Sequence, residues 1–257
     1  MSLPAILAAA TSLAGGFAAT IPPDWMQGRT SYGGLSAALA LEAARGAGED
    51  LPPLRSAQVS FIGPLAGAVT VTARLLRRGR NAAWVGAEVH CEHGLGLAAT
   101  FVFMGPVASA LHLDDSPPPP GRIAPADARP LPPGGGPAFL THFEARFAMP
   151  RAGEPMPEIA WWLRLKDRTA LDPMVEVLLV ADALPPGVMP LVRRAPVSSM
   201  TWLINLLTPA PVSDEGWWLL RSRGSYAEQG CSSQAMGVWN ATGAPIATGM
   251  QSIAVFG

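Results

Sequence analysis

The sequence predicts an α+β protein in which two long helices are each wrapped by a curved antiparallel β-sheet. One observation is the segment Ser31–Arg45, which is rich in Ala and Leu and apolar nearly all round, so that other structure must surround it. Another is a series of segments in which apolar and polar residues alternate, as in half-buried strands. The third is that the order helix, strand, three strands occurs twice. We interpret this as an internal duplication, with chance similarity of two meanders as the alternative.

Composition and charge limit the class of protein. The 257 residues, 49% of them hydrophobic and 14% charged, suffice for one large domain or two ordinary ones with a large core. A net charge of −1 argues against nucleic acid as the partner. Two distant cysteines favour free thiols in a reducing compartment. The apolar stretch Leu3–Ala19 is too short for a membrane span and follows no basic residue of a signal peptide. We therefore expect a soluble, cytoplasmic protein that binds neither nucleic acid nor a membrane.

The first half of the chain is predicted to contain one long helix and a meander. Gly33 and Gly34 open the helix, where they leave main-chain N–H groups accessible to a ligand; an easy loop-to-helix entry is the plainer alternative. The other elements expected here are a short helix over Ile6–Leu13 and strands over Gly16–Ile21, Ser56–Ile62, Val69–Leu75, Ala83–Cys91 and Leu97–Met104.

A proline-rich segment separates the two halves. Ten of the 33 residues from Gly105 to Pro137 are proline, which excludes a sheet interior or a helix. We therefore expect three parts: residues 1–105, a linker over residues 106–137, and residues 138–257. The elements expected in the last part are a helix over Asp172–Leu184 and strands over His142–Phe147, Ile159–Lys166, Ser198–Leu207, Trp217–Ser222, Cys231–Asn240 and Ile246–Phe256.

Four features, spread along the chain, resemble a known family. They are the helix start Tyr32–Leu39, the strand Ser56–Pro64, the turn Arg77–Asn81 and the last-strand residue Gln251. In this order they resemble the type II acyl-CoA thioesterases of the thioesterase-like superfamily, which have a double hotdog fold. The resemblance covers residues 21–256 apart from the proline-rich segment. It implies two sheets joined edge to edge, an acyl-CoA or related thioester as the partner, and association into a homodimer through the sheets.

The resemblance also implies where the substrate binds. In this family the thioester carbonyl lies at the start of a hotdog helix, where main-chain N–H groups polarise it. We therefore expect Tyr32, Gly33 and Gly34 to bind the substrate. The arginines at positions 77, 78 and 80 are candidates to contact the phosphates of CoA, although a solvated turn is the plainer interpretation.

The family activates a water with an Asp, a Ser or Thr, and a Gln. By the resemblance these roles fall on Thr201, Ser225 and Gln251, so that a threonine stands at the Asp position. A hydroxyl can hold a water but cannot accept its proton near neutral pH. Thr201→Asp is therefore expected to raise hydrolysis, and Glu228 is a candidate for a relocated base. Each of these residues also has an ordinary structural interpretation, as a strand or loop side chain.

Two functions follow from these residues. The first is an acyl-CoA thioesterase that hydrolyses acyl-CoA to a free acid and CoA, without a cofactor. The second is a non-catalytic acyl or acyl-CoA-binding protein with the same fold, which Thr201 favours. A metal site at His90–His93 is not expected, because strand alternation puts His90 and Cys91 on opposite faces.

Overall fold

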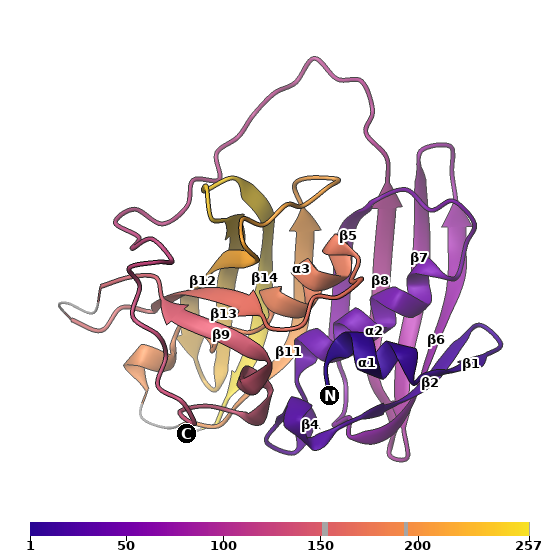
Figure 1. The fold of residues 1–257 in the computed structure, drawn as a ribbon, viewed down its shortest axis with the longest axis horizontal. Coiled ribbons are helices and arrows are strands. Elements are labelled where there is room, and N and C mark those ends of the chain that lie inside the picture. Colours follow the sequence, from indigo (N-terminus) through magenta and orange to yellow (C-terminus); the bar gives the residue numbers. More distant parts are fainter. Residues whose placement is uncertain (151–153, 193–194, 257) are drawn as a thin grey trace.

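The computed structural model describes residues 1–150, 154–192 and 195–256. Within these ranges one continuous antiparallel sheet of twelve strands curves around two helices (Figure 1). The elements before residue 105 are α1 Leu3–Ala8, β1 Thr11–Leu13, β2 Gly16–Ile21, β3 Met26–Gln27, β4 Thr30–Ser31, α2 Gly33–Arg45, β5 Leu54–Phe61, β6 Gly67–Arg78, β7 Ala82–Cys91 and β8 Gly94–Met104. Those after residue 137 are β9 Phe143–Phe147, β10 Glu158–Leu165, α3 Pro173–Ala181, β11 Val197–Leu206, β12 Trp217–Glu228, β13 Cys231–Asn240 and β14 Pro245–Val255. Single 3₁₀ turns lie at Pro23–Trp25, Ala138–His142 and Met189–Leu191.

The order of strands in the sheet confirms the predicted repeat. From the centre outward, one half runs β5-β8-β7-β6-β2-β1 and the other runs β11-β14-β13-β12-β10-β9. The two halves join edge to edge, because β5 and β11 pair antiparallel with Ser60 opposite Thr201 and Ser56 opposite Asn205. The junction leaves no free edge in the middle of the sheet, and so the two halves share one core.

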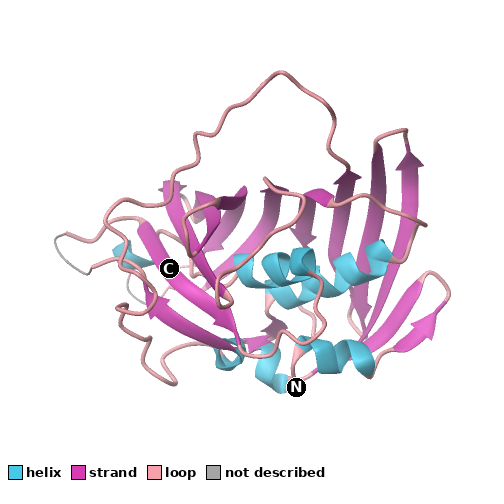
Figure 2. Cartoon of the chain, turned by 45° about the horizontal axis from the view of Figure 1, so that its top comes forward, coloured by secondary structure: helices cyan, strands magenta, loops and turns pink. Residues whose placement is uncertain are grey.

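The helices α2 and α3 lie antiparallel, side by side, against the same face of the curved sheet (Figure 2). At one end Arg45 Nη2 lies 2.8 Å from Asp172 Oδ2. At the other end a Cβ on Gly34 would meet the main-chain oxygen of Leu179, so the two backbones touch there. The helices therefore pair the N-terminus of α2 with the C-terminus of α3.

The helix α3 is shorter than the sequence predicts. It has nine residues, whereas the predicted helix extended over Asp172–Leu184. Asp172 lies outside the helix as its N-cap and accepts a hydrogen bond from the main-chain N–H of Met174 (2.8 Å). Asp182 is the C-cap, after which the chain turns toward two prolines that cannot continue a helix. Among the described residues, α2 with its 13 residues is the only long helix.

The N-terminal segment also differs from its prediction. The helix expected over Ile6–Leu13 is α1, which begins at Leu3 and ends at Ala8. The following residues form β1, which makes a hairpin with β2. The turn of this hairpin contains Gly15 with a φ of 75°, a left-handed conformation that favours glycine.

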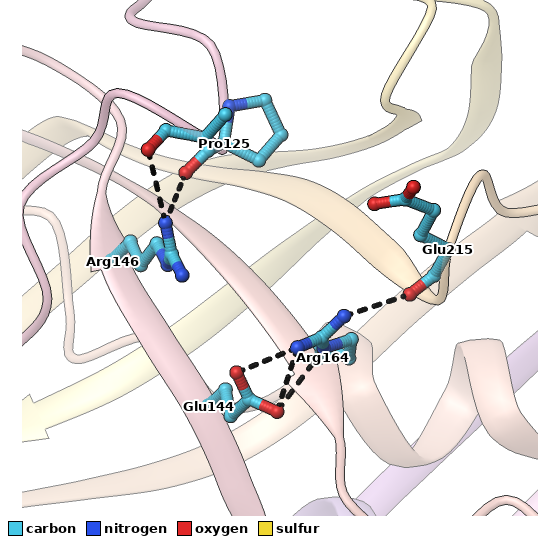
Figure 3. Close-up of polar contacts among 6 residues, drawn as sticks. Pro125, Glu144, Arg146, Arg164 and Glu215 are labelled. Atoms are coloured by element: carbon cyan, nitrogen blue, oxygen red, sulfur yellow. Dashed lines mark hydrogen bonds and ion pairs between the residues drawn. The ribbon is translucent and has the colours of Figure 1, made fainter.

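The proline-rich segment is fastened to the second half of the sheet. Residues 105–137, all of which the structure describes, contain no helix or strand beyond one isolated bridge. Trp239 Nε1 donates to the Ser116 carbonyl and Trp162 Nε1 to the Ile123 carbonyl (both 2.7 Å). Arg146 donates to the Pro125 carbonyl (2.6 Å; Figure 3). In contrast, residues 107–113 arch away from the body (Figure 1). No helix among the described residues is long and apolar enough to cross a membrane.

Candidate active site

A carboxyl group lies where the two helices meet. Asp182, the C-cap of α3, is half-buried and accepts a hydrogen bond from the main-chain N–H of Gly34 in the first turn of α2. A Cβ on Gly33 would lie 2.5 Å from Asp182 Oδ2 and 2.8 Å from the ring of Phe61. The absence of a side chain at Gly33 is therefore what lets the carboxyl group approach the start of α2.

Two buried glutamines connect Asp182 to the sheet. Gln251 on β14 donates from Nε2 to Asp182 Oδ1 (2.5 Å). Its Oε1 accepts from Nε2 of Gln234, the residue opposite it on β13 (2.9 Å). The Oε1 of Gln234 in turn accepts from the main-chain N–H of Gly187 (2.8 Å). The four groups form a continuous chain of hydrogen bonds that ends on the carboxyl group.

The surroundings of Asp182 change its proton affinity. Burial raises its pKa from the ordinary 3.8 to about 7, while the hydrogen bonds from Gln251 and Gly34 act in the opposite direction. A carboxyl group with a pKa near the working pH is present in part as the base and can accept a proton with a useful driving force. Asp182 is therefore suited to act as a general base at neutral pH.

The structure does not bring Thr201 together with Gln251. Thr201 pairs across the sheet with Ser252, whereas the next residue, Trp202, pairs with Gln251. Because successive strand residues point to opposite faces, Thr201 and Gln251 lie on opposite faces of the sheet. Thr201 is exposed on the outer face, and Gln251 is buried on the inner face.

Ser225 and Glu228 also lie apart from Gln251. Ser225 is the extra residue of a bulge in β12, is exposed, and donates to the main-chain oxygen of Ser233 (3.1 Å). Glu228 ends the same strand and accepts a hydrogen bond from the exposed hydroxyl of Tyr226 (2.6 Å). Gln251 is thus the one member of the predicted set that adjoins a carboxyl group in the structure, and that carboxyl group is Asp182.

Tyr32, Gly33 and Gly34 were predicted to bind substrate. The two glycines lie next to the Asp182 carboxyl group, whereas the hydroxyl of Tyr32 is buried and does not point toward that group. The Tyr32 side chain is fully buried, its ring stacks on Phe139 with centroids 4.0 Å apart, and its hydroxyl donates to the carbonyl of Leu179 (2.5 Å). Burial also raises the pKa of this hydroxyl. Tyr32 therefore ties the start of α2 to α3 and positions Gly33 and Gly34.

The arginine-rich turn lies at the other end of α2. Arg78 donates to the main-chain oxygens of Glu49 and Asp50, which follow the C-terminus of α2 (2.7 and 3.0 Å). Arg77 stacks over the ring of Trp84 (5.8 Å to the centroid). A helix of 13 residues is about 20 Å long, so this turn is far from the carboxyl group at the start of α2.

Comparison with protein families gives the class of protein. Residues 21–104 match the model of the acyl-CoA thioesterase N-terminal domain, and residues 115–255 match the model of the acyl-CoA thioesterase C-terminal domain. The chain therefore belongs to the acyl-CoA thioesterase family. A comparison with curated protein sequences finds no match.

Solved structures share the fold along the whole chain. One is a protein of unknown function with a hotdog fold from Alicyclobacillus acidocaldarius, with a TM-score of 0.86, 20% identity, and coverage of 100% of this chain and 99% of the other. Another is an acyl-CoA thioesterase II from Mycobacterium marinum, with a TM-score of 0.77, 16% identity, and coverage of 99% and 98%. Both are similar to this chain in fold, which is a hotdog fold of the α+β class.

Proposed function

We propose that this protein hydrolyses acyl-CoA to a free acid and CoA, with Asp182 as the general base and Gln251 as the residue that orients it. The observation that carries the proposal is the contact between Gln251 and Asp182 at the glycine-rich start of α2. Membership of the acyl-CoA thioesterase family supports the substrate class. The raised pKa of Asp182 supports its role as a base.

In the proposed reaction Asp182 takes one proton from a water molecule as the oxygen of that water attacks the thioester carbonyl carbon. The carbonyl oxygen becomes negatively charged, and the main-chain N–H groups at the start of α2 other than that of Gly34, which donates to Asp182, stabilise it. The carbon–sulfur bond then breaks, the sulfur leaves with the electron pair, and the proton held by Asp182 returns to it. The products are the free acid and the thiol of CoA.

Binding without catalysis is the second candidate function. Its basis is Thr201, a hydroxyl at the position where the resemblance implies an aspartate. Thr201 faces away from Gln251, and Asp182 supplies a carboxyl group on the inner face, so we prefer hydrolysis. The proposed base is then a different residue from the one that the resemblance suggested.

Release of free CoA from a panel of acyl-CoA esters, measured with a thiol reagent, tests the proposal. We expect wild-type turnover, a loss of about 10²- to 10⁴-fold in kcat for Asp182→Asn, and little change for the matched control Thr201→Val. Thr201→Asp should bring no gain, because the new carboxylate would lie on the outer face. Loss of activity in Thr201→Val or Ser225→Ala, with Asp182→Asn still active, would contradict the assignment. Binding of the esters without any turnover would establish the second function.

Two further predictions from the sequence remain proposals. We propose a cytoplasmic homodimer, and sedimentation of a 26.8 kDa species at high concentration would contradict the dimer. We also propose the division into residues 1–105, a linker over 106–137 and residues 138–257. Within this division the linker contacts the last unit, because the main-chain oxygens of Ser116, Ile123 and Pro125 accept hydrogen bonds from its side chains.

A further inference from the structure

We infer that Gln234 is a positioning residue, which fixes the orientation in which the Gln251 amide meets Asp182. The expected effect on kcat rests on the proposed function, whereas the expected effect on the titration of Asp182 does not. It starts from a buried side chain that has no place in the proposed reaction steps. Gln234 and Gln251 are 1% and 4% exposed, and neither the family resemblance nor the proposed chemistry gives Gln234 a role.

The direction of the hydrogen-bond chain is set at its far end. The main-chain N–H of Gly187 can only donate, so the group of Gln234 that faces it must be the acceptor Oε1. The donor Nε2 of Gln234 then faces Gln251, which must present its own Oε1. This leaves Nε2 of Gln251 to donate to Asp182. The main-chain N–H of Gly187 therefore determines the orientation of the Gln234 and Gln251 side-chain amides, either of which could otherwise exchange the positions of its oxygen and nitrogen.

Gly187 is held in a fixed position. A Cβ on Gly187 would lie 2.5 Å from the main-chain nitrogen of Gly224 on β12, so the two backbones are in direct contact. Two residues earlier, the Pro185 carbonyl accepts a hydrogen bond from the buried hydroxyl of Ser222 (2.9 Å). The Gly187 N–H, the first donor of the hydrogen-bond chain, is thus held against the sheet. If either buried amide reversed its orientation, a buried polar group would lose its hydrogen-bond partner.

The orientation of Gln251 decides which form of Asp182 is favoured. An N–H that points at the carboxyl group stabilises the carboxylate, whereas an oxygen that points at it accepts a hydrogen bond from the protonated acid and stabilises the neutral form. Without Gln234, the Gln251 amide is free to present either atom. The fraction of Asp182 in the basic form at neutral pH then falls, and the acidic limb of the pH–rate profile moves to higher pH.

The experiment measures the midpoint of the Asp182 carboxyl titration by carbon-13 NMR, together with the pH dependence of kcat. In Gln234→Met we expect the midpoint to rise by about one pH unit, the acidic limb of kcat to move with it, and KM for acyl-CoA to stay the same. The matched control is Ser232→Ala on the same strand and face, since Ser232 is buried and its hydroxyl has no hydrogen-bond partner among the described residues. We expect the control to leave the midpoint unchanged.

A second variant keeps the test valid if Gln234→Met does not fold. Gln234→Asn retains the amide but is one methylene too short to reach both partners, and we expect the same direction of shift. An unchanged midpoint in a folded Gln234 variant, or an equal shift in Ser232→Ala, would overturn the inference. If the midpoint moves as expected while the wild-type protein hydrolyses no ester, the positioning role stands and the proposed function fails.

Discussion

Replacing the proposed base should stabilise the protein and inactivate it at the same time. In Asp182→Asn the amide has nearly the same shape as the acid, and its Oδ1 can still accept the hydrogen bond from Gln251. The variant loses the ability to become charged in a buried place, and it also loses one of the two acceptor oxygens that receive hydrogen bonds from Gln251 and Gly34. The stabilisation is therefore expected to depend on pH, because the wild-type side chain is charged only above its pKa.

The size of the effect follows from the two pKa values of Asp182. The folded protein holds the proton up to about pH 7, whereas the unfolded chain releases it near the ordinary value of 3.8. A folded-state pKa above the unfolded one means that stability is fully present below about pH 4 and is lost as the pH rises to about 7. At 1.36 kcal/mol per pH unit, the rise from 3.8 to about 7 corresponds to about 4 kcal/mol.

Urea unfolding of the wild type and of Asp182→Asn at each pH from 4 to 8 measures this difference, since all other titrating groups cancel. We expect the stability of the variant relative to the wild type to rise by up to about 4 kcal/mol between pH 4 and pH 8. Asp115→Asn makes the same change of charge in an exposed residue and should show no such trend. A difference between wild type and Asp182→Asn that stays constant with pH would refute the reasoning.

Three other predictions follow from the positions of single residues and of the linker. Gly33→Ala should lower kcat about a hundredfold, because its Cβ displaces the proposed base, whereas Gly46→Ala at the far end of the same helix should not. Replacing Arg77 and Arg80 with Gln should leave KM for acyl-CoA unchanged, and a rise in KM would show that CoA reaches that turn. Cleavage by a protease within 107–113 should leave two fragments that co-migrate in gel filtration, because the sheet is continuous at the β5–β11 junction.

The strands were predictable because alternation is a local signal. The segment Ala83–Cys91 differs by one residue from β7, and Cys231–Asn240 has the bounds of β13. Ends were less predictable, because pairing between main chains needs no alternation. The strand β6 continues past the alternating residues to Arg78, where the side chains are exposed but the main chain still pairs with Ala83.

The candidate site was harder to predict because it depends on contacts that are distant in sequence. Gln251 was expected to contribute, but its partner Asp182 is 69 residues away. Asp182 lies at the end of α3, and the sequences of α2 and α3 do not predict how these two helices pack together. A single acid at the end of an apolar helix, just before two prolines, was the available signal. The face of Thr201 follows only from the register between β11 and β14, which contains a shift between Ser199 and Thr201.

The two halves of the duplication differ at the positions of the hydrogen-bond chain, so a search for one motif repeated in both halves would fail. The residues of β5 and β11 that face each other at the junction, Val59 and Trp202, pair outward with Ala99 and Gln251 respectively. The repeat therefore places Ala99 where the other half has Gln251. One strand further out, Ala99 pairs with Ala87, whereas Gln251 pairs with Gln234. Both amides of the hydrogen-bond chain correspond to alanines in the first half.

The helix ends differ between the halves in the same way. The C-cap of α3 is Asp182, and the C-cap of α2 is Gly46, which has no side chain to act as a base. The start of α2 has no side chain at Gly33 and receives the carboxyl group of Asp182, whereas the start of α3 is capped by Asp172, whose carboxylate contacts the Met174 N–H and an arginine of α2. On the proposed assignment, the base and both amides come from the second half and the helix start from the first. Neither half could then catalyse alone, which gives the edge-to-edge junction a role in function as well as in stability.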